Sequence, residues 1–119
     1  MRIPSTLATL LLITSYAFAT EPCQRIRGRA ILYLGDGQFR LWHVGTHHEF
    51  ALGENDESWN VLAKYMKDAN GVATNVVFGD FLVCPTAPLV KGAAQPAVVK
   101  SLSHPIVLTQ EEWAAMQKR

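Results

Sequence analysis

The chain has 119 residues, of which 49% are apolar and 18% charged, and its formal net charge is +1. This length allows one compact domain, and the apolar content excludes a disordered tail or a collagen-like fibre. A charge so close to zero also lacks the basic footprint of sequence-independent nucleic-acid binding, so we expect no nucleic-acid partner.

The first 19 residues have the pattern of a secretory signal peptide. Met1-Arg2 is a short positive start, residues 7–13 form a compact apolar stretch, and Ala17-Phe18-Ala19 is a small-x-small cleavage site. The apolar stretch is too short to cross a bilayer core of about 30 Å, so an uncleaved anchor is the weaker alternative. We expect cleavage after Ala19 and a mature domain of residues 20–119, periplasmic or secreted, with no net charge and no membrane span.

Cys23 and Cys84 are the two cysteines of the chain. In an oxidising compartment, an even number of cysteines in a small domain predicts a disulfide. Neither residue lies in a C-x-x-C motif, and two isolated thiols are too few for a thiolate zinc site. The sequence therefore predicts a structural disulfide rather than a redox pair or a metal site.

Three strands open the predicted mature domain. Residues 25–34 alternate in character, and Gly28 in their middle indicates a bulge or a bend at a barrel corner. Gly35-Asp36-Gly37 has the chemistry of a hairpin turn into a second strand at residues 39–44. A short third strand is expected at residues 47–52. One face of the first strand carries Ile26, Ala30, Leu32 and Leu34.

One internal helix is predicted after the third strand. Asn55 or Asp56 suits its N-terminal cap, and Asn70-Gly71 suits a left-handed C-terminal cap. An apolar stripe at helical spacing faces the core and consists of Trp59, Leu62, Ala63 and Met66. Then follow a fourth strand at residues 75–84, a Pro- and Gly-rich loop, a fifth strand at 97–102 with a short extension at 106–108, and a helical turn with a capping box at Thr109.

Three strands, a helix and two further strands are the element order of the OB-fold, a small five-stranded barrel. The long first strand with its internal glycine and the single central helix favour this barrel over a sandwich or an irregular α+β roll. We therefore predict a mainly β chain with an OB-like barrel, one helix between strands 3 and 4, and a short C-terminal helical turn.

Two segments carry a resemblance to a group of proteins. Arg40-Leu41-Trp42-His43-Val44-Gly45-Thr46 has the pattern R-hydrophobic-W-x-hydrophobic-G-T, and Phe78-Gly79-Asp80-Phe81-Leu82-Val83-Cys84-Pro85 contains GDF-x-V-C-P. Both resemble strand motifs of small exported bacterial proteins of uncharacterised role, and the match spans the chain from Cys23 to about Leu102. The resemblance implies membership of that group and an OB-like fold, but no activity.

Arginines and aromatic residues form the most suggestive candidate binding surface. Arg25, Arg27 and Arg29 share one side of the first strand, which Arg40 can extend, with Tyr33 and Trp42 nearby. Such a face stacks flat groups and steers anions. In an export compartment, we expect an anionic ligand or an envelope or extracellular protein to bind there. The alternative is a solvated face with cross-strand ion pairs.

Histidines and one acid suggest a metal site instead. His43, His47, His48 and Glu49 form the only such concentration, and imidazole suits Zn or Cu. In a strand His43 and His47 share a face, so Gly45 has to bend the chain, and Glu49 or the distant His104 has to supply a third ligand. The alternative, exposed imidazoles at a strand end, needs no cofactor, and we expect none.

Asp80 lies between Gly79 and Phe81 in an apolar strand. A partly buried carboxylate there needs a partner, and an arginine of the first or second strand is the expected one. The alternative is an acid/base residue of a hydrolase acting on envelope polymers. No nucleophile elbow, carboxylate pair, H-E-x-x-H helix or phosphate loop accompanies it. The sequence therefore favours a non-enzymatic binding module.

Overall fold

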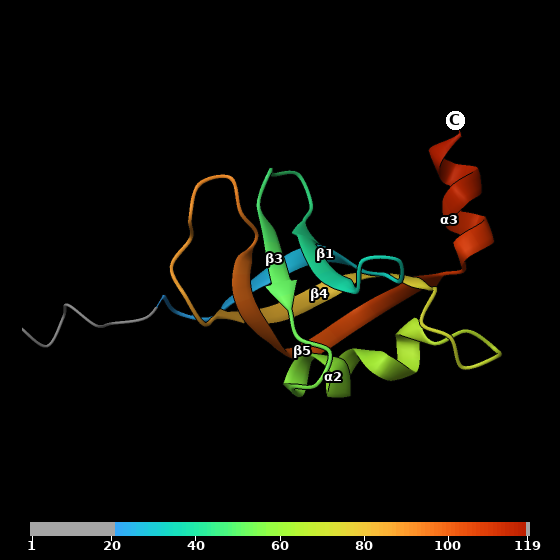
Figure 1. The fold of residues 1–119 in the computed structure, drawn as a ribbon, viewed down its shortest axis with the longest axis horizontal. Coiled ribbons are helices and arrows are strands. Elements are labelled where there is room, and N and C mark those ends of the chain that lie inside the picture. Colours follow the sequence, from blue (N-terminus) through green and yellow to red (C-terminus); the bar gives the residue numbers. More distant parts are fainter. Residues whose placement is uncertain (1–20, 119) are drawn as a thin grey trace, which may run out of the picture.

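In the part of the chain that the structure describes, five strands close into a barrel, and two helices lie outside it (Figure 1). The computed structural model describes residues 21–118, so the expected signal peptide at residues 1–19 lies outside the described part. No helix in residues 21–118 has the length and apolar character that crossing a membrane requires. The elements are β1 (Gln24–Tyr33), β2 (Gln38–His43), β3 (Glu49–Leu52), α2 (Glu57–Met66), β4 (Val76–Pro85), β5 (Gln95–Leu108) and α3 (Gln110–Gln117).

The strand order around the barrel is β1-β2-β3-β5-β4. β1 pairs antiparallel with β2 on one side and with β4 on the other, so the two motif-bearing strands flank it. A short parallel pairing of Phe50 with Gln95 and of Ala51 with Pro96 joins β3 to β5 and closes the circle. With α2 between the third and fourth strands, this is the predicted OB-like barrel, and the prediction is confirmed.

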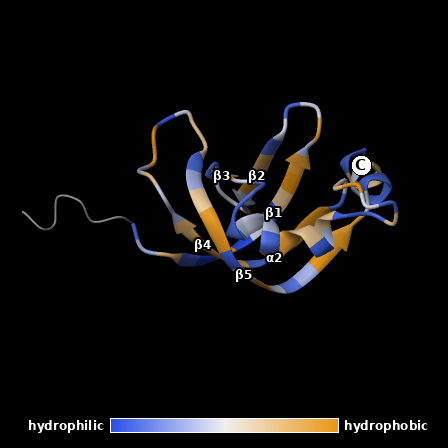
Figure 2. Cartoon of the chain, turned by 60° about the horizontal axis from the view of Figure 1, so that its bottom comes forward, coloured by the Kyte–Doolittle hydropathy of each residue, from blue (hydrophilic) through white to orange (hydrophobic). Residues whose placement is uncertain are grey.

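The barrel core is built from the inward side chains of the strands and from α2. Figure 2 shows apolar and polar stretches alternating along the strands, as expected when one strand face is buried. Leu62 and Met66 of α2 are fully buried, and Trp59 meets Phe39 edge to face with ring centroids 5.8 Å apart. The largest apolar strand residues that are fully buried are Phe39, Leu41, Phe50, Phe81, Val77, Val83 and Val99.

Gly28 is required by packing rather than by a bulge. The pairing of β1 with β2 and with β4 continues without a register shift at this residue. A Cβ atom on Gly28 would lie 2.7 Å from Cδ1 of Leu41 and 3.0 Å from Cδ1 of Phe81. The expected bulge is therefore absent, and the lack of a side chain at Gly28 leaves room for the core side chains of Leu41 and Phe81.

The α2 helix begins as expected and ends earlier. Asp56 is the N-cap, and its Oδ1 accepts from the backbone N–H of Ser58 at 2.8 Å. The helix ends at Met66 instead of at Asn70-Gly71, because Asn75 donates hydrogen bonds to the carbonyls at the end of the helix. The Asn75 backbone N–H donates to Met66, and its Nδ2 donates to the carbonyls of Tyr65 and Lys67.

The fifth strand is longer than the sequence suggested. β5 runs unbroken from Gln95 to Leu108, whereas we expected residues 97–102 and a separate piece at 106–108. Its pairing with β4 shifts register between Phe78 and Asp80, where His104 adopts φ +52°. A bulge thus lets β5 continue through residues 103–105, where we expected a break between two strand segments. Gly79 allows this close approach, since a Cβ there would lie 2.5 Å from Cδ1 of Leu102.

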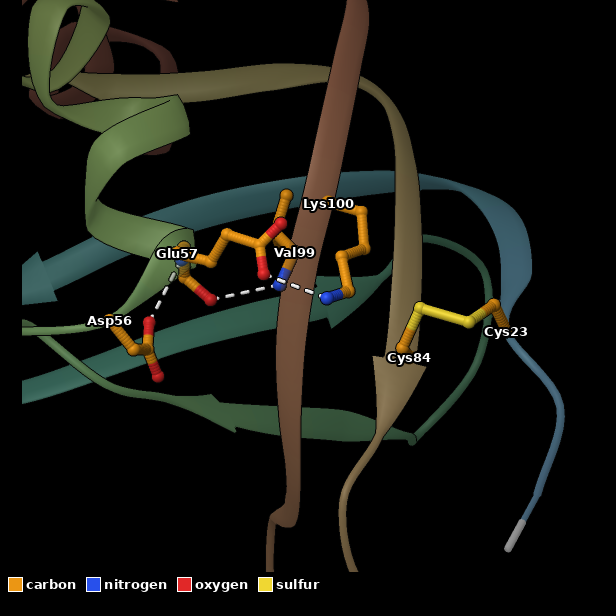
Figure 3. Close-up of polar contacts among 7 residues, drawn as sticks. Cys23, Asp56, Glu57, Cys84, Val99 and Lys100 are labelled. Atoms are coloured by element: carbon orange, nitrogen blue, oxygen red, sulfur yellow. Dashed lines mark hydrogen bonds and ion pairs between the residues drawn. A yellow bond between two sulfur atoms is a disulfide. The ribbon is translucent and has the colours of Figure 1, made fainter.

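The predicted disulfide is confirmed. Cys23, just before β1, is bonded to Cys84 near the end of β4 (Figure 3). The bond extends the antiparallel pairing of the two strands, in which Gln24 already faces Val83. It closes a sequence separation of 61 residues.

Candidate functional site

Arg29 is the centre of the arginine–aromatic face. It projects from the outer side of β1, and its guanidinium lies 4.6 Å from the ring centroid of Trp42 on β2 and 5.1 Å from that of Trp113 on α3. Its Nε is buried without a hydrogen-bond partner in the described part of the chain. The Arg29 guanidinium therefore contacts two aromatic rings, while its Nε–H makes no hydrogen bond to the described residues.

The β2–β3 turn fixes the orientation of Trp42. Its indole Nε1 donates to the carbonyl of Thr46 at 2.7 Å, and the Thr46 hydroxyl donates to the carbonyl of His43. Gly45 provides the positive φ of +88° that this turn needs. The residues of the first motif thus hold a tryptophan rigidly against Arg29.

The second ring comes from α3, a helix that the sequence predicted without indicating where it docks. Thr109 and Glu112 form the expected capping box. The helix buries no residue fully, and its Trp113 packs on Phe78 of β4 with centroids 6.0 Å apart. Trp113 is therefore the main anchor of α3 on the barrel, and it completes a site for which sequence reasoning had only Trp42 and Tyr33.

A hollow of about 450 Å³ opens beside this stack. We call it the Arg29 hollow. It lies between the second half of β1, the β1–β2 turn and α3, and its polar walls include Tyr33 and the side chains of Gln110 and Gln117. A volume in the range of about 300–1,000 Å³ is that of ordinary ligand sites. The remaining lining residues are Ile31, Leu32, Leu34, Gly35, Thr74, Val76 and Trp113.

The other predicted arginines have different surroundings. Arg27 faces Asp80 on β4, with 3.5 Å between Nε and Oδ1. Arg40 lies at 4.0 Å from Glu49 on β3. Arg25 is exposed and makes no ion pair within residues 21–118. The structure thus brings Arg29, Trp42 and Tyr33 to one region, while Arg27 and Arg40 are partly neutralised.

Asp80 has the partner that its position predicted. Its side chain is 26% exposed, and its second oxygen, Oδ2, lies 3.1 Å from Nδ1 of His104. One carboxylate therefore links β1 and β5 across β4. Both carboxylate oxygens of Asp80 thus have a partner on a neighbouring strand.

Two residues of the expected metal site, His48 and Glu49, have other partners. The ring of His48 bonds to the buried side chain of Gln95, which also donates to Glu21 at 2.7 Å. Glu49 faces Arg40, as described above, and His47 is exposed in the turn. Within residues 21–118 no three His, Cys, Asp or Glu side chains gather in a way that would hold a metal ion.

Comparison with known proteins adds no relative from which a function can be transferred. No family model, curated protein or solved structure matches this chain.

Proposed function

We propose that the chain is an exported, non-enzymatic binding module that holds an anionic group of an envelope or extracellular partner against the outer face of β1 and β2. The observation that carries the proposal is the stack of Arg29 between Trp42 and Trp113 beside the Arg29 hollow. Among the described residues, no carboxylate lies within 4.0 Å of this guanidinium.

Stacking leaves the guanidinium able to bind an anion. The two aromatic rings lie within 5.1 Å of the guanidinium carbon, and the terminal N–H donors of such a group match the two oxygens of a carboxylate or phosphate. Arginine, tryptophan and tyrosine are also the residues that most often dominate binding energy at protein interfaces. Trp42 and Tyr33 therefore give Arg29 the surroundings of an interface centre.

Two further features support the exported part of the proposal. The first 19 residues have the pattern of a cleavable signal, and the disulfide belongs to an oxidising compartment. Intact-mass measurement of the protein recovered from outside the cytoplasm tests this part. A chain beginning at Thr20 is expected, and an unprocessed chain contradicts it.

Quantitative capture tests the binding part. Mature wild-type protein is immobilised beside Arg29→Ala, Arg29→Lys and, as a matched control, Lys67→Ala, whose exposed side chain lies just beyond α2. Each is exposed to envelope extract of the source cells, and bound proteins are measured by mass spectrometry. Partners lost with both Arg29 variants and kept with Lys67→Ala support the proposal. Identical partners on all four proteins contradict it.

A further inference from the structure

A second hollow lies near α3, bordered by β4 and the end of β5. Its volume is about 360 Å³, and it shares no lining residue with the Arg29 hollow. We call it the Phe78 hollow. It is lined by Arg27, Phe78, Gly79, Asp80, His104, Ile106, Leu108 and Met116.

The walls of the Phe78 hollow divide into an apolar and a polar part. Phe78 and Ile106 face each other across the β4–β5 pairing, and Leu108 and Met116 continue the apolar surface. Ile106 is 61% exposed and Met116 51% exposed, so this apolar surface is open to solvent. An open apolar concavity with a few convergent polar groups is the usual form of a small-molecule site.

The polar part favours an anion. Asp80 is the only acid that lines the hollow, and its two oxygens already face Arg27 and His104. The Arg27 side chain is 72% exposed, and its contact with Asp80 runs through Nε at 3.5 Å. The two terminal nitrogens of its guanidinium are thus left to meet a ligand.

The backbone is built to hold His104 at this edge. The residue adopts φ +52°, which is uncommon for a residue with a side chain, at the register shift between β4 and β5. Bulges of this kind re-aim side chains next to binding sites. Here the bulge turns the ring onto Asp80 at the rim of the hollow.

We infer that the Phe78 hollow binds a single-chain amphiphile with a carboxylate head, such as a medium-chain fatty acid. The chain lies over Phe78, Ile106 and Met116, and the carboxylate meets the guanidinium of Arg27. Arg27 selects the head group, because its side chain is 72% exposed and its contact with Asp80 runs through Nε. The inference goes beyond the proposed function and does not depend on it, since the two hollows use different residues.

Titration of the purified mature protein with decanoate, followed by two-dimensional NMR of the backbone amides, tests the inference. For a ligand of this size we expect saturable binding with a dissociation constant of about 1 mM or tighter. The largest shifts should fall on Phe78, Ile106 and Met116. No saturation, or shifts centred elsewhere, overturns the inference.

Matched variants and ligands separate the two parts of the site. Arg27→Ala should weaken decanoate binding about tenfold. Arg25→Ala, two residues away on the same face of β1 and outside the hollow, should leave it unchanged. Ile106→Thr should weaken binding while Val107→Thr, its neighbour outside the hollow, does not. Decanol should bind less tightly than decanoate, and decyltrimethylammonium less tightly still. Equal effects of the two arginine variants, or equal binding of the cation, overturn the inference.

Discussion

The side-chain hydroxyl of Ser58 accepts a hydrogen bond from the backbone N–H of Val99 at 2.8 Å. Both residues are fully buried, one in the first turn of α2 and the other in β5. β5 shifts register against β4 between Leu82 and Val83, opposite this segment. The Ser58 hydroxyl on α2 thus accepts a hydrogen bond from a backbone N–H of β5 and links the helix to the barrel.

Replacing Ser58 by alanine should lower the free energy of unfolding by about 1–3 kcal/mol, since the buried N–H of Val99 loses its acceptor. Lys100→Ala is the control. Lys100 pairs with Glu57 at 2.7 Å right beside this contact, but both side chains are about half exposed (Figure 3). That pair should be worth about 0–1 kcal/mol. Urea unfolding measures the free energy of unfolding of both variants. Equal losses would show that the hydrogen bond of Ser58 contributes no more to stability than the exposed ion pair of Lys100.

Removing the disulfide by a Cys23→Ser, Cys84→Ser double substitution should cost about 4 kcal/mol, the chain-entropy value for a loop of this length. The crosslink joins strands that pair without it, so the fold itself should survive. Thermal unfolding of the oxidised wild type and of the double variant measures the cost. A loss below about 1 kcal/mol would show that the crosslink contributes little to the barrel.

Asp68 organises the segment after α2, and its carboxylate should make stability depend on pH. The backbone N–H of Val72 is the main cause that holds the pKa of Asp68 below its ordinary value of 3.8, helped by the N–H of Asn70 and the hydroxyl of Thr74. Because the folded pKa is the lower one, the charged form stabilises the fold above about pH 4, and this stabilisation is lost as the pH falls through the folded value.

Wild type should therefore be more stable than Asp68→Asn at neutral pH, and the difference should shrink as the pH falls below 4. Urea unfolding of both proteins at a series of pH values between about 2 and 7 measures this difference. Parallel stability curves would contradict the expectation.

Trp113 should decide whether α3 stays folded. The helix has 8 residues, fewer than the roughly 12–15 that an isolated helix needs, and none of them is fully buried. In Trp113→Ala the amides of α3 should lose protection from hydrogen exchange while those of the five strands keep it. Met116→Ala, at an exposed position of the same helix, is the control. Unchanged protection of α3 in both variants would show that other contacts hold it.

Local chemistry made much of the fold predictable from the sequence. The alternation of apolar and polar residues predicted the strands, and Asp56 and Thr109 predicted where the helices begin. The two isolated cysteines predicted the disulfide. The need of a partly buried carboxylate for a partner predicted the pairing of Asp80 with an arginine of the first or second strand, and the partner is Arg27 of the first.

Features that depend on tertiary contacts were not predictable in this way. The end of α2 is set by Asn75, which lies outside the helix and caps it through the fold. The continuity of β5 past Pro105 depends on a bulge against Gly79. The capping box predicted α3, but no local pattern specifies that an eight-residue helix sets Trp113 on Arg29.

Photo-crosslinking from Tyr33 tests the proposed binding face most directly. Tyr33 lines the Arg29 hollow and is 43% exposed, so the larger side chain of p-benzoylphenylalanine can extend into solvent from this position. The control carries the same group in place of Val90, an exposed residue of the β4–β5 loop. After irradiation in envelope extract, a discrete crosslinked partner from position 33 and none from position 90 is the expected result. Crosslinks from position 90 alone, or none from position 33, would contradict a binding face around Arg29.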